Sequence, residues 1–170
     1  MSHKQVNVRW ATDSDKPAIA RLLHGLMVYT AGLYDKPESE IKGVETVRAE
    51  LDRTFSQVRN IRYVVAEVDG EVAGICAVET SYSTWHAKPY MILNDLFVDP
   101  RFRRLKIGTA LLGFVTDCAR AAGCARLDLF VENANRGAIR LYEEFGFTRL
   151  KQASFSLPID ASAGGLGDRD

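Results

Sequence analysis

The order of apolar patterns along this 170-residue chain predicts a single α/β or α+β domain built around a mixed sheet. Two stretches with helical spacing come first, two alternating stretches joined by a tight turn follow, and strand and helix patterns then alternate to the end. Counting them gives about six to seven strands, mostly antiparallel, flanked by about four helices. We expect one domain over residues 1–170, with its core over 6–157 and a frayed tail over 160–170.

The first third of the chain is expected to form one strand and two helices. Residues 6–10 alternate apolar and polar side chains, as a half-buried strand does. Residues 17–27 follow, with a proline suited to a first helical turn and apolar residues at helical spacing. Residues 32–37 interrupt that spacing, and residues 40–58 resume it as a second amphipathic helix.

The middle of the chain changes to the two-residue period of β-strands. Asp69-Gly70 is a strong signal for a tight turn, and it lies between expected strands at 63–68 and 72–78. Residues 81–89 are polar and aromatic, and we expect them to form a loop. The next strand is expected over residues 90–98.

The last part of the chain alternates helices and strands. Residues 107–122 and 135–145 show helical spacing, and each stretch is followed by a glycine that can end a helix. A strand is expected between them over residues 126–131. Residues 147–157 are expected to supply the last strand or two.

The composition excludes several classes of function. Lys plus Arg number 22 and Asp plus Glu number 22, so the chain lacks the basic excess of a general nucleic-acid binder. No apolar run approaches the ~20 residues that cross a bilayer, and the N-terminus has no signal-peptide pattern. The three cysteines are an odd number and favour reduced thiols. We therefore expect a cytoplasmic protein with no metal and with neither nucleic acid nor membrane as a partner.

A strand that runs through a basic loop into a helix is the most informative segment. Within residues 93–112, four cationic side chains precede the expected helix: Arg101, Arg103, Arg104 and Lys106. A helix N-terminus presents unpaired N–H groups and partial positive charge, and Gly108 lacks a Cβ that would hold a ligand away from the backbone. The pattern predicts a phosphate or pyrophosphate site, although a solvated charge cluster before an ordinary helix would show the same residues.

Two motifs resemble those of the GCN5-related N-acetyltransferase (GNAT) family. The basic loop resembles the signature Arg/Gln-x-x-Gly-x-Gly/Ala, aligned with Arg103, Lys106 and Gly108. A second block resembles the family's closing motif, Asn-x-x-Ala-x-x-x-Tyr followed by Gly-Phe, at Asn135, Ala138, Tyr142, Gly146 and Phe147. The resemblance spans residues 6–157 and is nearest to the diamine acetyltransferase branch. It implies the GNAT fold and an N-acetyltransferase that uses acetyl-CoA.

Lys106 departs from the family pattern. Family members usually have glycine at the position of Lys106, and often at that of Arg104 as well. A lysine with a negative φ would keep its N–H pointing into the loop and would add its charge toward the phosphates, and we favour this interpretation. The alternative is that the lysine weakens coenzyme binding.

The resemblance also implies which residues hold acetyl-CoA. The backbone of the strand before the loop would pair with the pantetheine arm, and the N–H groups of the loop would surround the pyrophosphate. Asn135 would bond the arm, and Tyr142 would lie near the sulfur. The residues implied in this way are Leu96, Phe97, Val98, Arg103, Arg104, Lys106, Ile107, Gly108, Thr109, Asn135 and Tyr142.

Direct attack of a neutral amine on the thioester carbonyl is the chemistry that the resemblance implies. In this scheme the N–H of Val98 stabilises the oxyanion. Tyr142 protonates the departing thiolate, because a phenol with a pKa near ~10 is close to a thiol in acidity. Without that role, Tyr142 would be a core aromatic residue beside Phe145 and Phe147.

For the general base the resemblance offers Asp95. Histone-acetylating relatives have a glutamate where this chain has Ile92, and diamine acetyltransferases have Glu-Asp where it has Asn94-Asp95. Asp95 could deprotonate or contact a cationic acceptor, or it could be a solvated or salt-bridged strand carboxylate. Glu79 and His86 are weaker candidates.

The acceptor site is expected to combine aromatic and acidic residues. The substrate-binding residues expected are Tyr34, Trp85, Asn94 and Asp95, with Tyr29, Tyr82 and Tyr90 as further aromatic candidates. The aromatic residues could equally pack or contact a second copy, since the family points by analogy to a homodimer. Acidic residues before the second helix would favour a cationic acceptor. The acceptor is therefore expected to be a small, polyamine-like cationic amine or a protein lysine.

Two other functions stay open. The same fold could act on an antibiotic, an amino acid or a protein N-terminus. It could also be a non-catalytic coenzyme-A-binding regulatory domain, as Lys106 and Asn94 would suggest. A nucleotide-phosphate binder is disfavoured, because the chain has no Gly-x-x-x-x-Gly-Lys-Ser/Thr motif.

Overall fold

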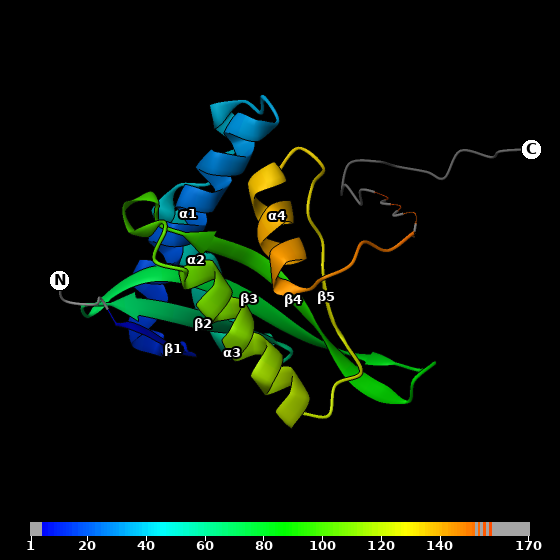
Figure 1. The fold of residues 1–170 in the computed structure, drawn as a ribbon. Coiled ribbons are helices and arrows are strands. Elements are labelled where there is room, and N and C mark those ends of the chain that lie inside the picture. The colour runs from blue at the N-terminus through cyan, green and yellow to red at the C-terminus, as the bar shows by residue number, and fades with distance from the viewer. Residues whose placement is uncertain (1–4, 152, 154, 156, 158–170) are drawn as a thin grey trace, which may run out of the picture.

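The chain folds around one sheet that carries a pair of helices on each face (Figure 1). The computed structural model describes residues 5–151, 153, 155 and 157. The strands are β1 (Val6–Trp10), β2 (Ile61–Val68), β3 (Glu71–Ser83), β4 (Lys88–Val98) and β5 (Leu127–Leu129). The helices are α1 (Lys16–Leu33), α2 (Val44–Gln57), α3 (Ile107–Ala121) and α4 (Arg136–Phe145).

The sheet is mixed, as the sequence predicts, but it is smaller than expected. Its strand order is β1-β2-β3-β4-β5; the first four strands pair antiparallel and β5 runs parallel to β4. The expectation of six to seven strands is wrong, because the described residues form five. The described part of residues 147–157 forms no strand, and Leu150 and Phe155 are exposed (64% and 93%). The tail expected over 160–170 lies outside the described residues.

Residues 81–89 form the end of a long hairpin rather than the expected loop. β3 continues to Ser83 and β4 begins at Lys88, which pairs with it. The hairpin projects past the helices (Figure 1), and Tyr82 and Trp85 at its end are 60% and 91% exposed. Polar side chains therefore suit these strands, and their composition resembled that of a loop.

The helix boundaries also differ from those predicted. α2 starts at Val44 after Gly43, and residues 38–40 form a separate 3-10 turn. α1 continues to Leu33, so Gly32 lies in its last turn. A glycine costs only ~1 kcal/mol inside a helix, which is too little to end a helix that packs on α2 and the sheet.

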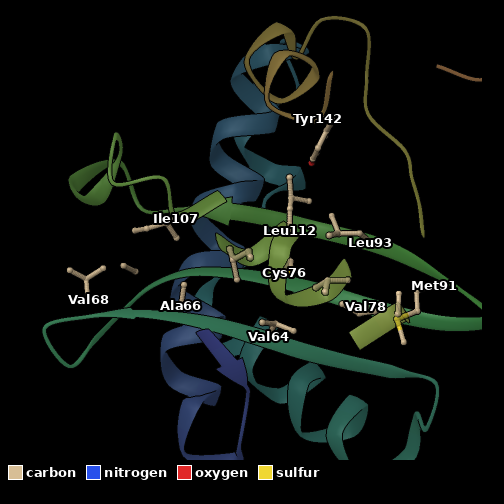
Figure 2. Close-up of a cluster of buried hydrophobic side chains, with 14 residues drawn as sticks. Val64, Ala66, Val68, Cys76, Val78, Met91, Leu93, Ile107, Leu112 and Tyr142 are labelled. Carbon is tan, nitrogen blue, oxygen red and sulfur yellow. The ribbon is translucent and has the colours of Figure 1, made fainter. Parts of the chain in front are cut away.

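Two apolar clusters hold the layers together. The larger cluster lies between the sheet and α3 and includes Leu93 of β4, Leu112 of α3 and Tyr142 of α4 (Figure 2). The second lies between the sheet and the α1–α2 pair and includes Leu51 and Phe97. β4 therefore contributes side chains to both clusters, which places its residues between the two helical layers.

Gly74 of β3 lets α3 pack closely on the sheet. A Cβ at this position would lie 2.7 Å from Cγ2 of Ile107 and 3.3 Å from Cδ1 of Leu111. Both side chains are buried, and a β-branched isoleucine is stiff at χ1. Gly113, in the same helix, has open space around its missing Cβ.

Replacing these two glycines should change stability in opposite directions. Gly74→Ala is expected to lower the free energy of unfolding by about 1–3 kcal/mol, because it overpacks the contact between β3 and α3. Gly113→Ala is expected to raise it by about 0.5–1 kcal/mol, because alanine is the better helix former. Urea unfolding of both variants measures the difference, and equal effects would contradict the tight contact at Gly74.

Candidate functional site

β4 carries one extra residue. Asp95 and Leu96 both lie opposite a single residue of β3, Cys76. Asp95 has the left-handed φ of 53°, which aspartate tolerates better than most side chains. This β-bulge interrupts the alternation of side chains along the strand. Leu93 packs in the α3 cluster, whereas Asp95, two residues later, lines the α1–α2 face.

Asp95 opens into a pocket of about 210 Å³ on that face. The side chains around the carboxyl group desolvate it and raise its pKa above the ordinary value, although it stays accessible to solvent through the pocket. No described side chain pairs or hydrogen-bonds with it, so it is not the salt-bridged carboxylate considered from the sequence. The other lining residues are Leu23, Leu26, Met27, Lys42, Val47, Glu50, Leu51, Thr54 and Tyr63.

On the opposite edge of β4, β5 separates just before the bulge. The two strands pair at three positions, the last of which joins Leu93 to Leu129. Beyond Leu93, the described residues leave this edge of β4 without a partner strand. The N–H of Asp99 donates to Ala73 on the β3 side (2.9 Å). Because successive N–H groups of a strand point to opposite edges, the N–H of Val98 points into the opening.

A buried carboxylate fixes the loop that follows β4. Asp99 is 5% exposed; it accepts the backbone N–H of Arg101 at 3.0 Å and guanidinium N–H groups of Arg101 and Arg21 at 2.8 Å. Arg101 and, to a lesser degree, Arg21 hold the pKa of this carboxyl well below its ordinary value. Arg101 also pairs with Glu71, so its charge is engaged within the fold.

The other cations of the loop have a different environment. Arg104 and Lys106 adopt left-handed backbone, with φ of 67° and 56°, and Lys106 is the N-cap of α3. Such residues turn backbone N–H groups into concavities that bind anions. The described residues provide no carboxylate that pairs with either side chain. Arg103 lies over the ring of Tyr29 of α1, 5.7 Å from its centroid.

The expectation of a negative φ at Lys106 is wrong. The chain enters α3 through the conformation that glycine adopts most easily, and this chain places a lysine there. The missing Cβ of Gly108 makes room for Leu141, since a Cβ there would lie 2.9 Å from its Cδ2. Ile107 is buried beneath the loop, and Thr109 is exposed on the first turn of α3.

α4 carries Asn135 and Tyr142. Asn135 caps the helix, since its Oδ1 accepts the N–H of Ala138 at 3.2 Å. Tyr142 is 8% exposed, packs edge-on against Phe147, and points its hydroxyl toward the sheet (Figure 2). Burial, together with the nearby Cys76, raises the pKa of Tyr142 to about 12. At neutral pH the hydroxyl keeps its proton and can donate it.

The aromatic residues predicted for the acceptor site do not line this pocket. Trp85 is 91% exposed on the β3–β4 turn. Asp95 lies seven residues beyond Lys88, which is about 23 Å of extended strand. Tyr34 follows α1, where desolvation and the charge of Glu132 raise its pKa. Asn94 is next to Asp95 on β4.

The two weaker base candidates lie on the hairpin strands and their turn. Glu79 of β3 accepts a hydrogen bond from Asn60 at 3.3 Å. His86 bonds the hydroxyl of Ser83 at 3.0 Å. Neither lines the pocket that contains Asp95.

Four polar residues of the pocket were not predicted from the sequence: Lys42, Glu50, Thr54 and Tyr63. The strand pattern could have identified Tyr63, because it lies two residues before the buried Val65 and shares its face. Nothing in the sequence relates Lys42 or Glu50 to Asp95. Their proximity depends on how α2 packs against the sheet.

The described residues contain neither a metal-binding cluster nor a membrane-spanning helix. No group of three or more His, Cys, Asp or Glu residues in that part of the chain could hold a metal ion. None of its helices is long and apolar enough to cross a lipid bilayer.

Comparison with known proteins places the sequence among acetyltransferases. The profile of the acetyltransferase (GNAT) family matches residues 29–147. The uncharacterized N-acetyltransferase YhfO of Bacillus subtilis (strain 168) is 33% identical over 143 residues, which cover 84% of this chain and 89% of that protein. The thialysine N-epsilon-acetyltransferase of Bos taurus is 31% identical over 157 residues, which cover 87% of each chain.

Solved structures show the same fold. The crystal structure of a possible acetyltransferase from Clostridium difficile 630 matches with a TM-score of 0.79, covering 91% of this chain and 98% of that one. A probable acetyltransferase matches with a TM-score of 0.75 over 91% of this chain. Their sequence identities are 18% and 24%, so these two likenesses concern the fold alone.

Replacing Lys106 by glycine should stabilise the chain. Lys106→Gly removes the left-handed strain of a residue with a Cβ and is expected to raise the free energy of unfolding by about 1 kcal/mol. Lys106→Gln removes the charge but keeps the strain, so its stability should stay near that of the parent. If chemical denaturation shows no difference between the two variants, the backbone at this position is not strained.

Asp95→Asn should stabilise the chain in a pH-dependent way. The raised pKa means that the folded chain binds this proton more tightly than the unfolded chain. The charged form therefore lowers stability at pH 7, and that cost fades as the pH falls toward the unfolded value near ~3.9. Asparagine tolerates the left-handed φ and carries no charge.

Thermal unfolding across this pH range measures the effect. The Tm gain of Asp95→Asn should shrink as the pH is lowered. Asp117→Asn, on the exposed face of α3, is the matched control and should change Tm little. A loss of stability in Asp95→Asn at pH 7 would contradict a desolvated carboxylate.

Proposed function

The chain belongs to the acetyltransferase (GNAT) family and is an acyltransferase, and we propose that it transfers the acetyl group of acetyl-CoA to a primary amine. The bulge at Asp95 is the observation that supports this most. It lies between an opening on one edge of β4 and a pocket on the α1–α2 face. An acyl donor and an amine could therefore reach the same few residues from different sides of the strand.

The residues present fit acetyl-CoA. The loop before α3 offers left-handed backbone, a helix N-terminus and the cations Arg103, Arg104 and Lys106, which together suit a pyrophosphate. The free edge of β4 at Leu96, Phe97 and Val98 suits an extended amide-bearing arm, and the Nδ2 group of Asn135 is left to bond it. Acetyl-CoA supplies an activated thioester.

Three groups of this chain would share the proton transfers and charge stabilisation. Asp95, with its raised pKa, accepts a proton from the ammonium group of the acceptor. The N–H of Val98 points into the opening and donates to the developing oxyanion. Tyr142 keeps its proton at neutral pH and gives it to the leaving thiolate. This division of roles uses no nucleophile of the protein.

The acceptor that we propose is a small cationic amine or a lysine side chain. The uncompensated Asp95 carboxylate favours a cation in the pocket. The relatives named thialysine N-epsilon-acetyltransferase support an acceptor with an amine on a side chain. Tyr34 and Asn94, neither of which lines the pocket, remain proposed contacts of the acceptor. Trp85, a homodimer and a cytoplasmic location remain predictions from the sequence alone.

The test combines binding and turnover. Acetyl-CoA is titrated into the protein by calorimetry, and thiol release is then followed with a panel of amines. Tyr142→Phe is expected to lower kcat by about 10²-fold, because the proton donor is lost, while the Kd for acetyl-CoA stays nearly constant. Asp117→Asn, on the exposed face of α3 and in none of the proposed sites, is the control and should retain full activity.

Each outcome separates the alternatives. Binding with thiol release supports the enzyme, and an unchanged kcat in Tyr142→Phe would make Tyr142 a core aromatic residue only. Binding without release across the amine panel would favour a coenzyme-A-binding regulatory domain. Failure to bind acetyl-CoA would mean that the lysine at position 106 has disabled the loop.

A further inference from the structure

The pocket beside Asp95 contains three charged side chains, and two of them have no ion-pair partner among the residues that the structure describes. Glu50 accepts a hydrogen bond from the guanidinium of Arg53 at 2.7 Å, so its charge is matched within α2. Lys42 forms no ion pair with a described carboxylate, and Asp95 forms none with a described cation. The pocket therefore offers one uncompensated negative charge and one uncompensated positive charge.

These two charges belong to different parts of the fold. Asp95 is on β4, in the sheet that closes one side of the pocket, and Lys42 precedes the first turn of α2. The side chains of Leu23, Met27 and Leu51 supply apolar wall from α1 and α2. The volume of about 210 Å³ corresponds to roughly seven water molecules. This suits a short aliphatic chain with a polar group at each end.

The backbone at Lys42 is held against α1. Nδ1 of His24 lies 3.0 Å from the carbonyl oxygen of Lys42. A carbonyl can only accept, so the ring nitrogen donates in this bond. The bond ties the connection before α2 to the helix that forms the neighbouring wall. The backbone of Lys42 is therefore held in place at the border of the pocket.

We propose that Lys42 is a specificity-determining residue that binds a carboxylate at the end of the acceptor opposite the reacting amine. The inference rests on the proposed function, and it narrows the acceptor to an amino acid with an amine on its side chain. An amine at Asp95 and a carboxylate at Lys42 satisfy both uncompensated charges. A polyamine would instead place a second ammonium group near Lys42, where like charges repel.

A pair of acceptors that differ only in the carboxylate tests the proposal. Lysine and cadaverine have the same five-carbon diamine chain, and cadaverine lacks the carboxylate. Calorimetry on the protein saturated with coenzyme A gives the Kd of each, and thiol release from acetyl-CoA gives kcat/KM. The parent chain is expected to prefer lysine by about five- to tenfold. Lys42→Gln should reduce this ratio to about one, and Lys42→Glu should reverse it.

Lys88 provides the matched control. It is an exposed lysine at the start of β4, outside the pocket, so Lys88→Gln should keep the parent ratio. Equal binding of lysine and cadaverine by the parent chain, or a ratio that Lys42→Gln leaves unchanged, would overturn the proposal. Turnover without that dependence on Lys42 would leave the proposed function intact. A Lys42-dependent binding preference without thiol release would instead support the specificity and contradict the enzyme.

Discussion

The extra residue in β4 determines how the rest of the site is arranged. With strict alternation from Leu93, Asp95 would point into the α3 cluster, where an ionised carboxylate would have neither water nor a partner. The bulge directs it to the α1–α2 face instead, and β5 stops pairing with β4 at the same point. One local irregularity thus lies between the pocket and the free strand edge. Its cost is a left-handed aspartate with a desolvated carboxyl, and the packing on both sides of β4 holds that conformation in place.

The cations of the loop after β4 fall into two groups, one paired within the fold and one without a described partner. Asp99 engages Arg101 and Arg21 and thereby joins α1 to the end of β4. Arg104 and Lys106 carry the same sign of charge but have no described partner, and both hold strained backbone. The sequence shows four cations within six residues, whereas the fold separates Arg101, whose charge is paired within the fold, from the solvent-exposed Arg103, Arg104 and Lys106.

Local patterns account for what could be predicted from the sequence. The turn at Asp69-Gly70 and the glycine after Phe145 follow from residue types at fixed spacing, and the structure has these features. The basic loop and the block with Tyr142 could be found because each is contiguous. The roles of those residues in binding and catalysis stay predictions.

Long-range packing accounts for most of what could not be predicted. Lys42 and Glu50 meet Asp95 only after α2 packs on the sheet. The hairpin between Ser81 and Pro89 is polar because it leaves the core, so its strands had the composition of a loop. The backbone of Lys106 could not be inferred either, because a lysine gives no sign of the left-handed φ that its position requires.

The placement of the pocket and the strand opening on different sides of β4 has a kinetic consequence. With the acyl donor at the opening and the amine in the pocket, as proposed, neither ligand would have to pass through the site of the other, so they could enter in either order and leave independently. Cys76, the residue opposite the bulge, is fully buried, and burial raises the pKa of its thiol to about 12. It therefore stays protonated and cannot carry the acyl group between two half-reactions. The fold thus favours a sequential mechanism, in which both substrates are bound before either product leaves, and disfavours a ping-pong one.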